Sequence, residues 1–550
     1  MPFYITTPIY YVNDHPHIGH CYTTVLADVL ARFFRLKGGE EVFSLTGTDE
    51  HADKVVTSAA KNGATPQEWA DRNAEEFKKA FAFFNISNDD FIRTTQPRHK
   101  ERVIRYITKL MESGDIYKGD YTGWYDEGQE EYLTETAARE ADFKSPINHR
   151  PLIKRTEACY FFRLGKYQQK LLDLIGSDES FIRPDARRQE VLGRLRPPQV
   201  LNDVPVSRPV TDDPATQWGI RVPGDDAHRI YVWIDALFNY LSVVDNDAQR
   251  KFWPASVHLI GKDILWFHAV IWPALLMALG EPLPKTIFGH GWWISEGQKM
   301  SKSMGNFIDL EKLQQYASKY SLDALRWYLA TQGPLSGADS DFSEAKFIEV
   351  YNSELANSFG NSTSRTGNMV EKYFEGVLPM IVGDGRFNVG PGSDLELAAA
   401  ARANAKNPMA PGTENRSFDF PAKCAECVAT ALAAANRQEI DVALHAGLSL
   451  VRAVDEFISH TAPFTLAKQF PDERGREALA RILYACAESL RIASVLLSPA
   501  MPQKCGALWG YWNCTPTPGA KLADLCTFGG SHALKPGCKI AKGEVLFMRA

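Results

Sequence analysis

The sequence lacks the segments that would place a protein in or across a membrane. No apolar run approaches the ~20 residues that a membrane helix needs, and the stretch 271–279 is short and contains proline. No charged or Arg/Ser-rich leader precedes the first predicted strand, which begins at Phe3. The nine cysteines are an odd number spread over 550 residues, which is not a disulfide framework. These absences favour a soluble protein of the reducing cytoplasm.

An excess of positive charge is absent too. Lys and Arg number 61 against 67 Asp and Glu, so the formal net charge is −6. This balance argues against a polybasic nucleic-acid binder but leaves room for a local basic track. Hydrophobic residues at 45% and charged residues at 23% are ordinary for globular chains. At about 150 residues per domain, the length predicts roughly three to four domains.

The first part of the chain has the pattern of an α/β protein. Apolar spacing predicts a strand over 3–8, a helix over 17–37 that ends at Gly38-Gly39, and a strand over 41–45. This is the order of a parallel strand–helix–strand unit. Strand-like segments return at 229–234, 257–260 and 287–289, after an irregular stretch over 116–228.

The last part of the chain has helical spacing from about 346 onward, with long amphipathic stretches over 442–458 and 476–497. The Gly/Pro/Ala-rich segment 383–423 within it is predicted to be irregular.

A short histidine motif, Pro16-His17-Ile18-Gly19-His20, lies at the predicted strand-to-helix transition. A helix N-terminus offers backbone N–H groups and the positive end of the helix dipole, which suits a phosphate. Histidines at i and i+3 share one face, and the glycine lets a base or a backbone approach closely. The motif is short, and two structural histidines near a helix cap are an equally good interpretation of it alone.

A lysine motif, Lys299-Met300-Ser301-Lys302-Ser303, follows the strand-like segment 287–289. Two lysines three apart among hydroxyl residues form a cationic loop that can close over a polyphosphate and neutralise charge in a transition state. The alternative is a solvated surface turn. The glycines of a Walker motif are missing, which disfavours a Walker-type ATPase.

Together, the two motifs resemble the signatures of class I aminoacyl-tRNA synthetases, in the expected order and on the expected elements. Segments 5–13, 46–51, 231–236 and 261–264 resemble the methionyl-tRNA synthetase family in particular, and the similarity covers 3 to about 375 and about 430 to the end. The resemblance implies formation of methionyl-adenylate from methionine and ATP, with release of pyrophosphate. Transfer of methionine to the initiator and elongator methionine tRNAs, with release of AMP, would follow.

The resemblance also implies a division of the chain. A Rossmann-type catalytic domain with a parallel sheet would occupy 1–115 and 229–295, split by an inserted connective domain over 116–228. Residues 296–345 would form the mobile lysine loop and a stem-contact region, and 346–550 an all-α anticodon-binding bundle. The insertion leaves no room for a large editing domain, so selectivity would depend on the pocket, where one methyl is worth ~1–3 kcal/mol. Because the appended tRNA-binding, dimer-forming domain of some relatives is missing, a monomer is expected.

The same resemblance assigns the candidate active-site residues. The catalytic candidates are His17, His20, Lys299 and Lys302. ATP, entering with Mg²⁺, would be bound by His17, Gly19, His20, Gly261, Asp263 and Lys302.

The methionine pocket carries over as Ile9, Tyr11, Asp49, Trp233, Ala236, Tyr240, Ile264, His268 and Trp272. A carboxylate such as Asp49 can hold the α-ammonium group, and aromatic walls suit a thioether. A tyrosine hydroxyl can donate to the sulfur. His268 and Trp272 are four apart, which places them on one helix face. Without the resemblance, such an aromatic stripe is more often ordinary core.

Recognition of the anticodon is expected from the helical region. Asn357, Asn361 and Arg365 recur every four residues and match family positions that read the anticodon, although a polar solvated face gives the same spacing. Phe464 replaces the family's usual stacking tryptophan, and any aromatic plane can stack on a base. Arginines between 183 and 196 outnumber the acidic residues there, which makes this track a candidate for the tRNA acceptor end.

No structural zinc is expected in the insertion, because no paired thiolates occur between Cys21 and Cys159. The C-x-x-C pair Cys424 and Cys427 lies in the helical region, and two packed thiols are the favoured interpretation.

Three other functions stay open as alternatives. A class I synthetase for cysteine would need a zinc site, and its ligands are not evident. A catalytically silent tRNA-binding paralogue would have lost the two histidines or Lys302, all of which are present. A generic nucleotidyltransferase would lack the helical region.

Overall fold

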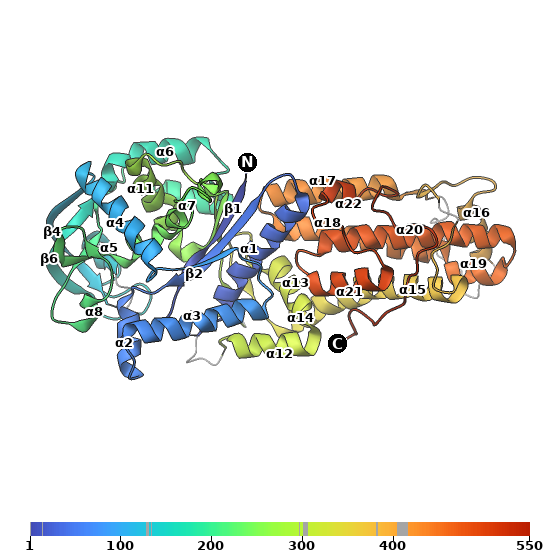
Figure 1. Cartoon of the computed structure of the whole chain (residues 1–550), viewed down its shortest axis with the longest axis horizontal. Coiled ribbons are helices and arrows are strands. Elements are labelled where there is room, and N and C mark those ends of the chain that lie inside the picture. The colour runs from blue at the N-terminus through green and yellow to red at the C-terminus, as the bar shows by residue number, and fades with distance from the viewer. Residues whose placement is uncertain are drawn as a thin grey trace. The chain divides into compact units, whose positions relative to one another are not determined.

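The computed structural model describes residues 2–13, 15–127, 131–133, 135–295, 297–300, 306–380, 383–403 and 416–550. The chain forms two compact units (Figure 1). The first unit contains Met1–Thr24, Phe43–Trp292 and Ser336–Ala338, and the second contains Val25–Val42, Trp293–Leu335 and Asp339–Ala550. No helix among the described residues is long and apolar enough to cross a membrane.

The first unit is built on a six-stranded sheet in the order β3-β2-β1-β12-β13-β7. Its strands are β1 (Phe3–Tyr11), β2 (Val42–Asp49), β3 (Asp90–Arg93), β7 (Ile182–Arg183), β12 (Val257–Gly261) and β13 (Ile287–His290). The registered pairs are parallel, with Ile5 opposite Val257 and His258 opposite Ile287. The chain builds outward from β1 through β2 to β3 and then returns to the other side of β1. Ligands of such sheets bind at the carboxyl ends of the strands where the order reverses, here between β1 and β12.

Helices surround this sheet and bury its apolar residues. They are α1 (Ile18–Lys37), α2 (Asp53–Lys61), α3 (Pro66–Phe83), α4 (Pro97–Glu112), α9 (Val232–Leu237), α10 (Asn239–Ser242), η2 (Arg250–Phe252), η3 (Lys262–Ile264), η4 (Phe267–Ile271) and α11 (Trp272–Leu279). Local sequence explains several of their ends. Thr65 and Glu68 form a reciprocal capping box at the start of α3, and Gly280 ends α11 at φ 72°.

The segment 116–228 is not one separate block. It forms a four-stranded sheet, β5-β4-β6-β8, and a three-stranded sheet, β10-β11-β9. The strands are β4 (Ile116–Asp126), β5 (Glu131–Leu133), β6 (Ile153–Phe162), β8 (Val204–Pro205), β9 (Ser207–Pro209), β10 (Arg221–Val222) and β11 (Asp225–Ile230). The helices are α5 (Glu135–Glu140), η1 (Leu164–Tyr167), α6 (Gln168–Ser177), α7 (Asp185–Leu195) and α8 (Pro214–Gln217). The same segment of the chain also contains β7, which pairs with β13 and so belongs to the central sheet.

The predicted strand over 229–234 is wrong in its second half. β11 ends at Ile230 and pairs with β9 and β10 rather than with the central sheet, and α9 begins at Val232. A short apolar run does not distinguish a buried strand from a buried helix, and here tertiary packing decided.

The second unit is mainly helical, as expected. Its helices are α12 (Leu310–Tyr320), α13 (Leu322–Gln332), α14 (Glu344–Val350), η6 (Tyr351–Gly360), α15 (Asn361–Phe374), α16 (Asp394–Ala403), α17 (Phe420–Asn436), α18 (Ile440–Thr461), α19 (Pro463–Gln469), α20 (Glu473–Leu497), α21 (Pro502–Trp512) and α22 (Leu522–Leu525). Short strands accompany them: β14 (Trp293–Ser295), β15 (Gln298–Lys299), β16 (Ser340–Asp341), β17 (Arg386–Phe387) and β18 (Phe418–Asp419).

A buried ion pair lies inside this unit. The guanidinium of Arg326 on α13 contacts the carboxylate of Asp28 at 2.6 Å, and both side chains are fully buried. Arg326 also donates to the carbonyls of Pro499 and Ala500. Removal of either partner would leave an uncompensated buried charge, which typically costs about 3–5 kcal/mol.

The irregular structure predicted for 383–423 is wrong for residues 394–403, which form α16. Asp394 on this helix makes a two-bond contact with Arg481 on α20, at 2.8 and 2.9 Å. The Ala-rich stretch gave weak periodicity because small side chains carry little amphipathic contrast. β17 and β18 pair with each other in the same segment.

Candidate active site

The histidine motif lies where the sheet topology places a ligand. β1 ends at Tyr11, and α1 begins at Ile18 immediately after His17. The His17 and His20 rings lie 3.8 Å apart between centroids. A Cβ at Gly19 would lie 3.0 Å from the His17 ring, so glycine leaves room for this closely packed, tilted pair.

The hydrogen bonds of the two rings define where their protons lie. The Gly19 N–H donates to His17 Nδ1 at 3.1 Å, and the His17 N–H approaches His20 Nδ1 at 3.4 Å. A nitrogen that accepts carries no proton, so each neutral ring is protonated at Nε2. Burial, with the neighbouring His17, lowers the pKa of His20 well below its usual range. This half of the site therefore offers two ring N–H donors beside a helix N-terminus, which suits phosphate oxygens.

Gly261 and Asp263 lie across the switch point, at the carboxyl end of β12. A Cβ at Gly261 would lie 2.5 Å from Asp263 Oδ1, so a larger residue there would displace that carboxylate. Asp263 Oδ1 also accepts from the Trp292 indole N–H at 3.1 Å. His290, at the end of β13, contacts the Thr23 hydroxyl of α1 at 2.8 Å and ties the two sides together. His290 was not predicted from the sequence, because no local motif surrounds it.

The nine methionine-pocket candidates gather in the first unit in two layers. Tyr11 and Trp233 meet edge to face at 6.0 Å, and Trp233 stacks on Phe267 at 4.4 Å. Ile9 and Ile264 are partly exposed beside them. The second layer is buried and consists of Asp49, Ala236, Tyr240, His268 and Trp272. Trp272 has no exposed surface, so it supports the wall rather than lining it.

Tyr240 and His268 form a directed hydrogen-bond chain. His268 Nδ1 donates to the Ile264 carbonyl at 2.9 Å, which leaves Nε2 as the acceptor for the Tyr240 hydroxyl at 2.7 Å. Burial lowers the pKa of His268 to about 4, so the ring is neutral near pH 7. The Tyr240 proton is thus directed at His268, which differs from the expectation that it points to a substrate sulfur. Below them, the Trp272 indole donates to His258, whose other nitrogen contacts Thr6.

The segment that carries Asp49 is held by hydrogen bonds of the two residues that follow it, Glu50 and His51. Glu50 is buried, and its carboxylate accepts two bonds from Arg93, at 2.7 and 3.1 Å. His51 Nδ1 donates to Asp235 at 2.5 Å. Asp235 lies on α9 between Trp233 and Ala236, so this contact fixes the Asp49 segment against one wall of the pocket.

A second histidine completes the contact around Asp235. His99 on α4 donates from Nε2 to Asp235 at 2.7 Å, and its Nδ1 contacts the Ser242 hydroxyl at 2.9 Å. Burial alone would raise the pKa of Asp235, but the hydrogen bonds and charges of His51 and His99 hold it well below its usual range. The sequence pattern did not single out these three residues for a role, because they lie far apart in the chain.

The lysine motif belongs to the second unit. Lys299 lies on β15, where its backbone pairs with Ile294 of β14. Lys302 falls within 301–305, outside the described residues.

The anticodon candidates also lie in the second unit. Asn357 and Asn361 are exposed, and Arg365 is half-buried. The predicted single helix is interrupted by the π-helical segment η6, which changes the angular spacing of Asn357 relative to the other two. Asn357 accepts from Arg549 at 2.6 Å. Phe464 is 42% exposed and lies 6.3 Å from Tyr373 between ring centroids.

His, Cys, Asp and Glu are the side chains that commonly hold a metal ion in proteins. Within the described ranges, no group of three or more of these side chains is arranged to hold an ion. Cys424 and Cys427 are buried on α17, and burial raises the pKa of both thiols, as for packed thiols.

Comparison with known proteins agrees with this geometry. The family model described as "tRNA synthetases class I (M)" matches residues 3–141 and 139–367. The methionine–tRNA ligase of Caldanaerobacter subterraneus subsp. tengcongensis is 42% identical over all of this chain and 78% of its own length. That of Streptomyces coelicolor is 41% identical over all of this chain and 96% of its own length.

The solved structures agree as well. Methionyl-tRNA synthetase of Mycobacterium tuberculosis in complex with methionyl-adenylate superposes with a TM-score of 0.84 at 32% identity, covering 99% of both chains. The fold is that of a class I tRNA synthetase. Within that class, the chain belongs to the methionine–tRNA ligase family, and the family expected from the sequence is confirmed.

Proposed function

We propose that this protein attaches L-methionine to methionine tRNA in two steps. The methionine carboxylate attacks the α-phosphorus of ATP, which forms methionyl-adenylate and releases pyrophosphate. A hydroxyl of the tRNA's terminal adenosine then attacks the adenylate carbonyl, and AMP leaves. The observation that carries the proposal is the facing pair of motifs at the switch point, His17–His20 after β1 and Gly261–Asp263 after β12, with Asp49 at the neighbouring end of β2.

The phosphates of ATP would lie at the start of α1. The Nε2–H groups of His17 and His20 would donate to the phosphate oxygens, where negative charge grows as the α-phosphorus is attacked. Gly261 and Asp263 would hold the nucleoside, with the carboxylate accepting from ribose hydroxyls. Lys299 and Lys302 would bind the leaving pyrophosphate, and Mg²⁺ would arrive bound to ATP. No covalent enzyme intermediate is needed, because positioning and electrostatics can carry the reaction.

Methionine would lie against the exposed layer of the pocket. Asp49 would accept the α-ammonium group, and Ile9, Tyr11, Trp233 and Ile264 would pack around the side chain. Because Tyr240 donates to His268, we propose that the thioether is recognised mainly by shape and by aromatic contact, each such contact being worth about 0.3–1.5 kcal/mol. Ala236, His268 and Trp272 would set the shape of the pocket from below.

Recognition of the tRNA would extend to the helical unit. We assign Asn357, Asn361 and Arg365 to the anticodon bases and Phe464 to stacking on one of them. The released side chain of Asn357 could contact a base once its bond to Arg549 opens. Both the initiator and the elongator tRNA would be substrates. The protein would act in the cytoplasm as a monomer and without a structural zinc ion.

Pyrophosphate exchange tests the first step directly. Wild-type protein is incubated with ATP, labelled pyrophosphate and each of the twenty amino acids in turn, and Lys302→Ala is measured in parallel. We expect exchange with methionine alone, weakened in Lys302→Ala and unchanged by a zinc-selective chelator. Exchange with a different amino acid overturns the pocket assignment. Absence of exchange with tRNA binding retained identifies a silent paralogue.

A further inference from the structure

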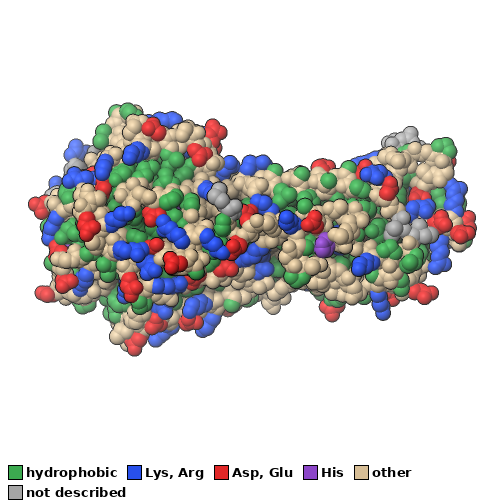
Figure 2. Space-filling model, turned by 45° about the horizontal axis from the view of Figure 1, so that its top comes forward, with side chains coloured by type: hydrophobic (Ala, Val, Ile, Leu, Met, Phe, Trp, Pro, Cys, Tyr) green, Lys and Arg blue, Asp and Glu red, His purple; other side chains and the backbone are tan. Residues whose placement is uncertain are grey.

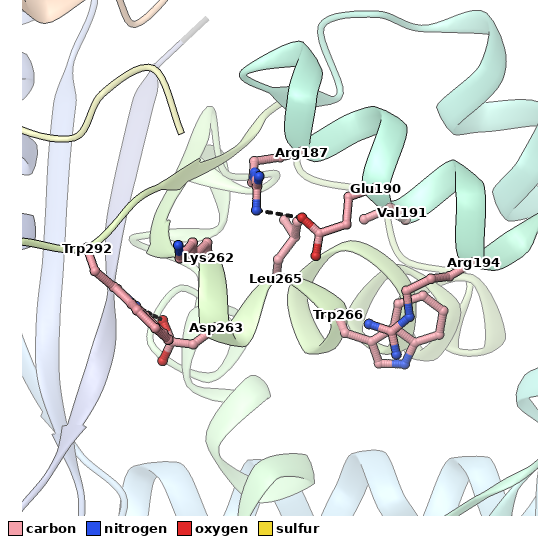
Figure 3. A pocket seen from close by; sticks show the side chains of 9 residues that line it. All are labelled: Arg187, Glu190, Val191, Arg194, Lys262, Asp263, Leu265, Trp266 and Trp292. Atoms are coloured by element: carbon pink, nitrogen blue, oxygen red, sulfur yellow. Dashed lines mark hydrogen bonds and ion pairs between the residues drawn. The ribbon is translucent and has the colours of Figure 1, made fainter. Parts of the chain in front are cut away.

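A cavity of about 300 Å³ in the first unit extends beyond the proposed ATP site. It is lined by residues of α7, of the segment 262–266 and by Trp292 (Figure 3). Asp263, Lys262 and Trp292 lie at one end, whereas Arg194 and Trp266 lie at the other (Figure 3). The Asp263 end belongs to the site described above. The Arg194–Trp266 end has no part in the binding of ATP or methionine proposed above.

The chemistry of the far end suits a nucleotide. The guanidinium of Arg194 lies 3.8 Å from the centre of the Trp266 ring. A guanidinium that stacks through its face keeps its N–H edge directed outward, where it can donate to a phosphate. The half-buried indole offers a plane on which a base can stack. A nucleotide carries both a phosphate and a base.

The remaining lining residues give the cavity a net positive charge. Arg187 pairs with Glu190 at 2.5 Å, and Lys262 lies 4.6 Å from the centre of the Trp292 ring. Three cations thus face the two carboxylates of Glu190 and Asp263. Basic and acidic side chains are otherwise mixed over the face seen in Figure 2, so a polyanion would be held by local sites of this kind rather than by a broad positive field.

Not all of the arginines that the sequence suggested for the tRNA acceptor end line this cavity. Arg188 is buried and donates to Asp185 at 2.9 Å and to the Ile175 carbonyl at 3.2 Å. It therefore stabilises the start of α7 and does not face the cavity lining. Arg187 and Arg194 do line it, and they lie seven residues, or about two turns, apart on α7.

We infer that the Arg194–Trp266 end binds a nucleotide of the single-stranded 3′ end of the tRNA, next to the terminal adenosine. This inference deepens the proposed function and rests on it. The terminal adenosine must reach the adenylate at the Asp263 end, so the preceding nucleotide needs a place beside that end. A cavity of about 300 Å³ is at the lower limit of ligand sites, which is suited to one nucleotide rather than several.

Paired assays separate this role from ATP binding. Arg194→Ala, Trp266→Ala and Trp266→Phe are compared with wild type, and Arg196→Ala is the matched control, because Arg196 is exposed beyond the end of α7 and outside the cavity lining. We expect methionine-dependent pyrophosphate exchange to stay within twofold of wild type in all four. In tRNA aminoacylation, Arg194→Ala and Trp266→Ala should lower kcat/KM about 5- to 100-fold, the range for a lost base stack. Trp266→Phe and Arg196→Ala should retain most activity.

A modified tRNA tests the contact itself. Its penultimate nucleotide is replaced by an abasic one, and aminoacylation is measured with wild type and Trp266→Ala. The abasic change should lower wild-type kcat/KM as the variant does, and the two changes combined should cost no more than either alone. If the abasic tRNA and Trp266→Ala lower kcat/KM independently, so that their losses multiply, the inference is wrong. It is also wrong if the variants raise the KM for ATP in pyrophosphate exchange, because the whole cavity would then belong to the ATP site. Loss of both activities in Trp266→Ala and Trp266→Phe also overturns it in favour of a structural role. If wild type itself shows no methionine-dependent exchange, the proposed function fails instead.

Discussion

The neutral state of His268 makes a quantitative prediction about acid stability. Its ring donates to the Ile264 carbonyl and accepts from Tyr240, so a second proton would remove the acceptor that Tyr240 needs. Burial lowers its pKa to about 4 from an ordinary 6.5. Between these values the unfolded chain binds the proton and the folded chain does not, so this residue's contribution to the free energy of unfolding falls as pH falls. From pH 7.5 to pH 5 the linkage relation gives a loss of about 2 kcal/mol.

The variant His268→Asn removes this titration. At pH 7.5 it should lower the free energy of unfolding by about 1–3 kcal/mol, because the buried Tyr240 hydroxyl loses its acceptor. At pH 5 the difference in the free energy of unfolding between variant and wild type should be about 2 kcal/mol smaller. Only the wild type loses stability on acidification through this residue, because its ring is protonated in the unfolded chain but not in the folded one. Urea unfolding at both pH values measures the difference. His149→Asn is the control, because His149 is exposed and its φ of 58° is one that asparagine tolerates. A deficit for His268→Asn that is the same at both pH values refutes the argument.

Substitutions at three further positions test other parts of the protein. Asp49→Asn should raise the methionine KM in pyrophosphate exchange about 10- to 100-fold, because a charged hydrogen bond is worth about 1.5–3 kcal/mol; an unchanged KM would remove Asp49 from ammonium binding. Asp235→Ala should lower the free energy of unfolding in urea by about 2–6 kcal/mol, since two buried histidine donors lose their acceptor at ~1–3 kcal/mol each; a loss under 1 kcal/mol would contradict that reasoning. Phe464→Ala should lower tRNA aminoacylation about 5- to 100-fold without changing exchange, whereas Phe464→Trp should retain it; equal activity of the alanine variant would exclude stacking.

Local sequence was sufficient for the elements whose signals are strong. The helix predicted over 17–37 is observed as Ile18–Lys37, and the stretches predicted over 442–458 and 476–497 lie within α18 and α20. Long amphipathic segments with clear ends give such signals, because periodic burial of one face dominates their stability. The strand over 229–234 and the irregular segment 383–423 were predicted incorrectly in part, because a short apolar run and an Ala-rich stretch have no distinctive period.

The sequence by itself determined the family and the residues of the two motifs, because phosphate chemistry demands histidines, lysines and glycines at close spacing along the chain. Only the tertiary structure decided how the site is supported. Asp235 meets His51 and His99 across 184 and 136 positions of sequence, and the Tyr240 hydroxyl meets His268 across 28. The direction of the Tyr240 proton, the depth of Trp272 and the placing of Arg194 against Trp266 follow from packing between distant segments. Local spacing carries no record of such contacts, since a hydrogen bond depends on where the fold brings two atoms together and not on their separation along the chain.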